Sequence, residues 1–199
     1  YERLAEETAT RSNAIEKDRK LMDEAAGAYM KNCADFMQDQ YQAFAKEIEA
    51  GAEPVKLKER QLKVMWMNDV VDLGNTVRVA NFKAQSLREP ALLKDALKGF
   101  DEIAKKIDAV KAATRLDANL KQLEAIRKAA GAYKEASVSL LANWNALEEL
   151  GKRRSKSGDA VLAESSATAN AGIEGTEDIA ENALSVLSSA STMMVVGLA

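Results

Sequence analysis

One face of a predicted helix combines the residue types that bind a carboxylate. Within the helix expected over residues 55–88, Val71, Asn75, Arg78 and Phe82 share this face because they follow one another at helical spacing. A carboxylate ligand needs a fixed cation, neutral hydrogen-bond donors and apolar walls that exclude water. The opposite, predicted core face carries Leu73, Val77, Ala80, Ala84 and Leu87. We therefore predict a ligand-binding or dimer face; the alternative is a solvated face with incidental apolar residues.

Two aromatic residues elsewhere could complete such a site. Trp66 lies on the core stripe of the same helix, where core packing and stacking against a ligand are both open. Tyr133 belongs to a later helix, and its hydroxyl could donate a hydrogen bond to a ligand if the two helices adjoin. The candidate ligand-binding residues are therefore Asn75, Arg78, Phe82, Val71, Tyr133 and Trp66.

Several other kinds of chemistry lack the residues that they require. The chain has no His and one Cys, Cys33, which excludes His-dependent nucleophiles, His-ligated zinc and an intramolecular disulfide. Carboxylates are plentiful over residues 3–50, but no His or Lys pair accompanies them to support acid–base catalysis. The net charge of −3 argues against nucleic acid as a partner. We expect no enzymatic activity, no cofactor and no metal site.

Apolar residues recur at helical spacing along nearly the whole chain, which predicts an all-α fold. Gly51 is expected to end the first helix, and Pro54 fits the first turn of the second. Pro90 is expected to end the second helix and open the third, and Asp117 to cap the fourth. The predicted helices cover residues 3–50, 55–88, 90–113 and about 117 to the end of the chain.

The fourth helix is the longest of these predictions. From Leu162 to Met194, small and apolar residues alternate in steps of four and three, a pattern typical of a tightly packed seam between helices. Either the helix breaks near Gly151 and Gly158, or this half packs against absent chain or a second subunit. The apolar run over 193–199 is expected to be a buried helical turn or the start of a transmembrane helix.

Three segments resemble a known receptor family. The sequence Gly-Asn-Thr-Val-Arg-Val-Ala-Asn-Phe-Lys at 74–83 resembles a segment of the periplasmic sensor domains of methyl-accepting chemotaxis proteins. The run over 115–150 is similar as well, and the stripe that leads into 193–198 resembles the last sensor helix entering the second transmembrane segment. The subtype that this chain resembles is the helical bimodular sensor domain. The resemblance covers residues 55–199, and residues 1–54 more loosely.

This resemblance implies an elongated antiparallel up-down bundle of two stacked four-helix modules. Residues 1–199 would form one sensor domain, with a membrane-distal bundle over about 1–150 and a membrane-proximal part over 151–199. Family members are usually longer, so the first helix with its ligand-binding arginines is expected to be missing or shortened here.

The resemblance also implies a function. The chain would be the periplasmic portion of a homodimeric inner-membrane chemoreceptor that is anchored by flanking transmembrane helices. It would bind a small organic acid or amino acid and transmit a helix displacement across the membrane. The alternative is a helical structural or interaction protein that binds a protein partner.

Overall fold

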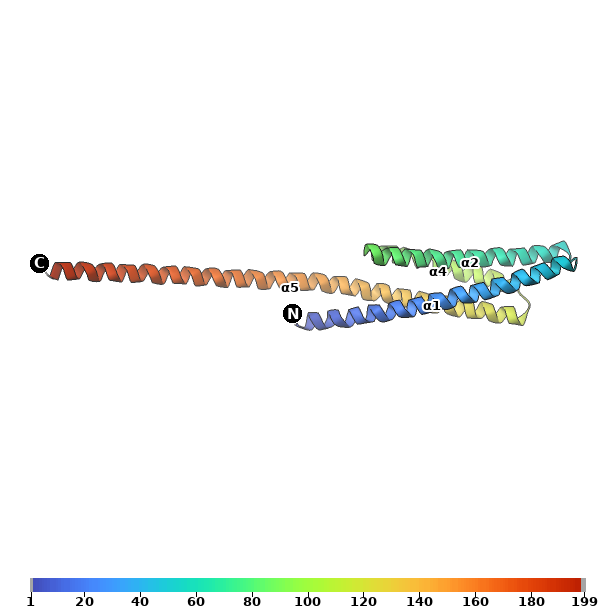
Figure 1. The fold of residues 1–199 in the computed structure, drawn as a ribbon, viewed down its shortest axis with the longest axis horizontal. Coiled ribbons are helices and arrows are strands. Elements are labelled where there is room, and N and C mark those ends of the chain that lie inside the picture. The colour runs from blue at the N-terminus through green and yellow to red at the C-terminus, as the bar shows by residue number, and fades with distance from the viewer. Residues whose placement is uncertain (1, 198–199) are drawn as a thin grey trace. The chain divides into compact units, whose positions relative to one another are not determined.

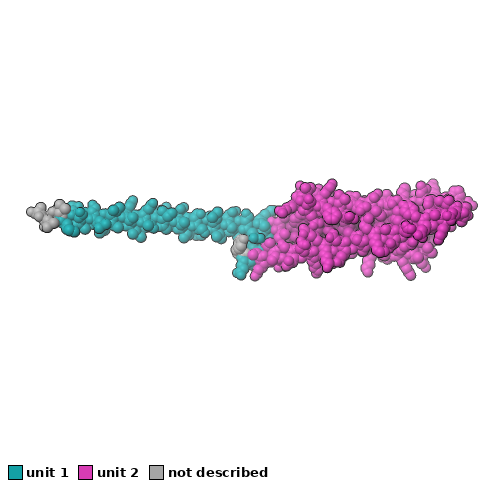
Figure 2. All heavy atoms as spheres, viewed as in Figure 1, with its two compact units in different colours: residues 1–4, 150–199 teal, residues 5–149 magenta. Residues whose placement is uncertain are grey.

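The computed structural model describes residues 2–197, and these residues form helices joined by short turns. The helices are α1 (Glu2–Glu49), α2 (Pro54–Leu87), α3 (Pro90–Ala96), α4 (Gly99–Ala112) and α5 (Asp117–Gly197) (Figure 1). The predicted all-α fold class is confirmed. The described chain divides into two compact units, one of residues 5–149 and one of residues 2–4 and 150–197 (Figure 2).

Local signals in the sequence end and begin the first helices as predicted. Gly51 has a φ of 65°, and its N–H donates to the carbonyl of Ile48 at 3.0 Å, which closes the end of α1. Pro54 and Pro90 are the first residues of α2 and α3, where a missing N–H is tolerated. Arg88 ends α2 in the left-handed conformation.

The region after Pro90 differs from the single predicted helix over 90–113. Lys98 donates its N–H to the carbonyl of Asp95 at 3.3 Å, and Phe100 donates to Leu97 at 3.2 Å. These tight turns separate α3 from α4, and they lie next to Gly99, a residue of low helix propensity. Asp117, the predicted cap, is instead the first residue of α5.

Residues 5–149 form a four-helix bundle of α1, α2, α4 and the first part of α5. Side-chain bonds join each helix to the next in the ring, and Figure 1 shows these helices running along one another. The connections are Tyr29–Val70 for α1 and α2, Asp69–Lys106 for α2 and α4, Asp101–Lys134 for α4 and α5, and Asn32–Ala125 for α1 and α5. The core of this bundle therefore lies between α1, α2, α4 and α5.

The core face of α2 is rotated relative to the predicted one. Gly74 and Asn81 are buried, whereas Leu87 of the predicted stripe is 59% exposed. The reason is the close approach of Tyr29, whose ring lies where a Cβ on residue 74 would stand. Because glycine leaves this space empty, α2 turns the glycine toward the core and brings Asn81 with it.

Helix α5 continues to Gly197 without a break, so the first of the two alternatives, an interruption near Gly151 and Gly158, is wrong. The seam residues from Leu162 to Met194 are all exposed. Within the described residues, no helix has a stretch long and apolar enough to cross a lipid bilayer. The last two residues of the predicted membrane-entering run, 198 and 199, lie outside the described residues.

Candidate ligand-binding site

A cavity of about 290 Å³ is lined by α1, α2 and α5. Met22 and Met30 of α1 form an apolar wall of this cavity. Helix α2 contributes Arg78 and Phe82, and α5 contributes Tyr133. The sequence placed these last three residues on two separate helices, and the bundle brings them to one cavity. We call this space the Tyr133 cavity.

Two buried polar side chains line the Tyr133 cavity. Tyr133 is 1% exposed, and its hydroxyl forms no hydrogen bond with any described residue. Burial raises the pKa of Tyr133 to about 12, so the hydroxyl keeps its proton at neutral pH and remains a donor. Asn81 is 2% exposed; its carbonyl oxygen accepts from Gln85 at 3.0 Å, and its amide nitrogen has no acceptor among the described residues. Both side chains can therefore bond a ligand.

Opposite charges also line this cavity. Arg78 comes from α2, and Asp23 comes from α1. Neither forms an ion pair with a described residue, and the Arg78 guanidinium lies 5.9 Å from the centre of the Phe82 ring. A guanidinium binds carboxylates through paired N–H donors, whereas a carboxylate binds ammonium groups. The arrangement can therefore bind a small molecule that has one or both of these groups.

The remaining predicted site residues lie elsewhere. Asn75 lines a separate hollow of about 600 Å³ with Val79 and with Leu92 of α3. Val71 and Trp66 are half-buried and pack against the core. The structure therefore divides the predicted face of α2 between the Tyr133 cavity and the other surfaces of the helix.

Two polar residues of the cavity, Asp23 and Asn81, were not predicted as site residues. Asp23 is one of the carboxylates of the first helix that no His or Lys pair accompanies, and Asn81 is a polar residue on the core side of α2. The spacing of Asn81, three residues after Arg78, is a signal that could have placed the two on neighbouring positions of one helix. The position of Asp23 along its own helix does not indicate which helix packs beside it.

The comparisons with known proteins return no match. No protein-family model, no curated protein and no solved structure is detectably similar to this chain. The resemblance to chemotaxis sensor domains is therefore a prediction from the quoted residues alone. Among the described residues, no group of three or more His, Cys, Asp or Glu side chains could hold a metal ion.

Proposed function

We propose that this chain is the extracytoplasmic sensor domain of a bacterial transmembrane chemoreceptor, and that the Tyr133 cavity binds its ligand. The observation that supports this proposal is that the Tyr133 hydroxyl, the Arg78 guanidinium and the Asp23 carboxylate line one cavity. The hydroxyl can donate to an acceptor of a ligand, beside the charges of Arg78 and Asp23.

The charges favour an amino acid among the expected ligands. Arg78 is suited to the carboxylate of the ligand, and Tyr133 and Asn81 add neutral donors. Asp23 is suited to an ammonium group, and it would repel the second carboxylate of a dicarboxylic acid. A zwitterionic α-amino acid matches both charges at once.

In this proposal the ligand acts by moving helices. The cavity is lined by α1 and α5 together, so a ligand that contacts both can change their relative position. Helix α5 is continuous from Asp117 to Gly197, which supports transmission of a displacement along its axis. The receptor would be a periplasmic homodimer anchored in the inner membrane, with residues of about 1–150 as the membrane-distal module. A second module over 151–199 would be completed by further helices.

Thermal denaturation with a panel of amino acids and organic acids tests this proposal. A ligand at about 100 times its Kd should add about 2.7 kcal/mol to the free energy of unfolding and raise the melting temperature. We expect the rise for amino acids, and we expect Arg78→Ala, Asp23→Asn and Tyr133→Phe to weaken binding. Lys83→Ala, also an exposed cation of α2 but outside the cavity, is the matched control.

Two results would contradict the proposal. One is the absence of a rise with every compound in the panel. The other is a rise that persists unchanged in Arg78→Ala, Asp23→Asn and Tyr133→Phe, which would place the ligand outside the Tyr133 cavity.

The alternative function, a helical protein with a protein partner, is favoured by one observation. Apolar side chains of α5, including Leu162, Ile173 and Leu187, are exposed at steps that keep one helix face. Such a face is typical of helix pairing. Binding of a partner helix without any small-molecule ligand would favour this alternative.

A further inference from the structure

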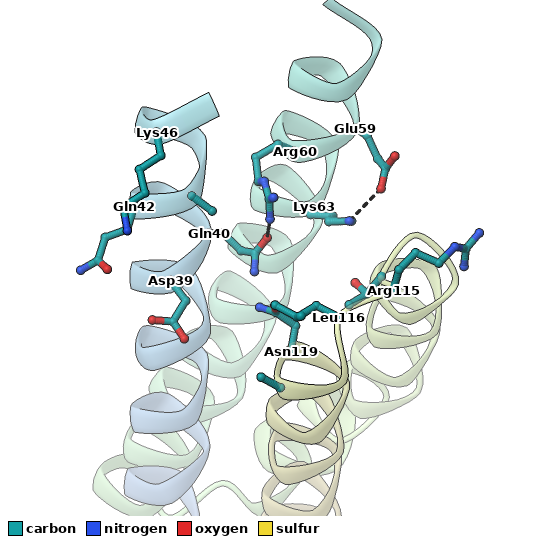
Figure 3. A pocket seen from close by; sticks show the side chains of 13 residues that line it. Asp39, Gln40, Gln42, Lys46, Glu59, Arg60, Lys63, Arg115, Leu116 and Asn119 are labelled. Carbon is teal, nitrogen blue, oxygen red and sulfur yellow. Dashed lines mark hydrogen bonds and ion pairs between the residues drawn. The ribbon is translucent and has the colours of Figure 1, made fainter. Parts of the chain in front are cut away.

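A second cavity, of about 390 Å³, lies where α1, α2, the α4–α5 loop and the start of α5 meet (Figure 3). It shares no lining residue with the Tyr133 cavity. We call it the Gln40 cavity, after the most deeply buried polar side chain that lines it, which is 1% exposed. Any ligand here would bind independently of contacts with Arg78 or Tyr133.

Positive side chains outnumber negative ones around the Gln40 cavity. The cations are Lys46, Arg60, Lys63 and Arg115, and the carboxylates are Asp39 and Glu59. The hydrogen bond and the charge of Lys63, followed by the charges of Arg115 and Arg60, hold the pKa of Glu59 below its usual range. Glu59 therefore stays ionised and offsets one cation. Glu47, which is bound to Arg60, offsets a second cation, and Asp39 a third. The one positive charge that remains favours an anionic ligand.

Two of these cations remain available for a ligand. The Lys46 side chain forms no hydrogen bond or ion pair with the described residues, and the Arg115 side chain donates to the carbonyl of Ala112 at 3.0 Å. By contrast, Arg60 is bound to the carboxylate of Glu47 at 2.6 Å. Lys46 and Arg115 are exposed, so their side chains can turn toward a ligand.

Gln40 supplies a buried donor that no described residue accepts from. Its carbonyl oxygen accepts from Arg60 at 2.6 Å, while its amide nitrogen has no acceptor. Figure 3 shows the Gln40 side chain reaching between the helices, toward Leu116 and Asn119. The Gln40 side chain lines the cavity, so its amide nitrogen can donate to an oxygen of a ligand there. This observation indicates a ligand that offers acceptors.

The first turn of α5 adds a third feature. Ala118 and Asn119, next to Asp117 at the start of α5, line the cavity. The first N–H groups of a helix lack intrahelical acceptors, and the positive end of the helix dipole favours anions there. We propose that the Gln40 cavity binds a small multivalent oxyanion, either inorganic phosphate or a polycarboxylate, through Lys46, Arg115, the Gln40 amide and this helix end.

Isothermal titration of the 199-residue protein with phosphate and, separately, with citrate tests this site, at an ionic strength held constant with chloride. We expect saturable binding of at least one anion. Tighter binding of phosphate would indicate a phosphate ligand, and tighter binding of citrate would indicate a polycarboxylate. The double variant Lys46→Gln/Arg115→Gln should weaken binding at least about tenfold, because it removes both available charged donors from the site. Both side chains are exposed, so the melting temperature should hardly change.

Controls separate a built site from general attraction of anions. Lys98→Gln/Lys105→Gln removes the same charge from exposed lysines outside the cavity and should leave binding unchanged. Arg78→Ala should also leave it unchanged, so failure of the Tyr133 cavity as a ligand site would not affect this test. The proposal is overturned if neither anion saturates the folded protein, or if the control pair weakens binding as much as Lys46→Gln/Arg115→Gln.

Discussion

Contact between Tyr29 and Gly74 sets how closely α1 approaches α2. The Tyr29 ring occupies the place of a Cβ at residue 74, and its hydroxyl donates to the carbonyl of Val70 at 2.5 Å. Gly74→Ala must therefore displace the ring or separate the helices. We expect the free energy of unfolding to fall by about 1–3 kcal/mol in urea denaturation, the usual effect of overpacking a core.

The matched control is Gly131→Ala in α5. Gly131 is also a helical glycine, but a Cβ there would meet nothing within 4 Å. Alanine has the higher helix propensity, so this variant should gain about 0.5–1 kcal/mol. Equal stability of the two variants would show that Tyr29 adapts to a Cβ at residue 74 and does not fix the spacing of α1 and α2.

Single residues also show how much of the candidate site the sequence could predict. Arg78, Phe82 and Tyr133 were predicted because their types suit a carboxylate ligand. Asp23 was not, because the residues that line a cavity depend on which helices pack together, and the periodicity of one helix does not contain that information. Asn81 was missed because a polar residue does not mark a core face in a hydrophobic pattern.

At the scale of elements, the helix ends with strong local signals were predictable. Gly51, Pro54 and Pro90 act through their own backbone preferences, and the structure places them at helix ends. The separation of α3 from α4 at Leu97 was not predictable, because no proline marks it and the apolar spacing continues across it. The rotation of α2 was also missed, because it depends on Tyr29 of another helix.

Asp18 joins α1 to α5 through both of its carboxylate oxygens. They accept from the hydroxyl of Ser139 at 2.9 Å and from the amide of Asn143 at 2.7 Å, and Asp18 is 7% exposed. Asp18→Asn replaces one acceptor oxygen with an NH₂ group that cannot accept and removes the charge. We expect the free energy of unfolding, measured in urea, to fall by about 1–3 kcal/mol.

Asp69→Asn is the control for Asp18→Asn. Asp69 also joins two helices, by an ion pair with Lys106 of 2.6 Å, but its side chain is 42% exposed. Exposed ion pairs contribute about 0–1 kcal/mol, so this variant should lose less stability than Asp18→Asn. A larger loss for Asp69→Asn would mean that burial does not set the strength of these connections between helices.

At the scale of the whole molecule, the main core cluster and both proposed cavities belong to residues 5–149. The core cluster extends from Ile15 to Leu140, and residues 151–194 are exposed or half-buried. Because burial of apolar surface provides most of the stability, a chain of residues 5–149 should still unfold cooperatively. It lacks the buried Leu4 and Leu150, so its free energy of unfolding should fall by at most about 3–6 kcal/mol. A chain of residues 5–132, which lacks the core residues Tyr133 and Leu140, should not unfold cooperatively. Thermal denaturation followed by circular dichroism compares the three chains. Loss of cooperative unfolding in the 5–149 chain would instead show that residues 150–197 belong to the same folding unit.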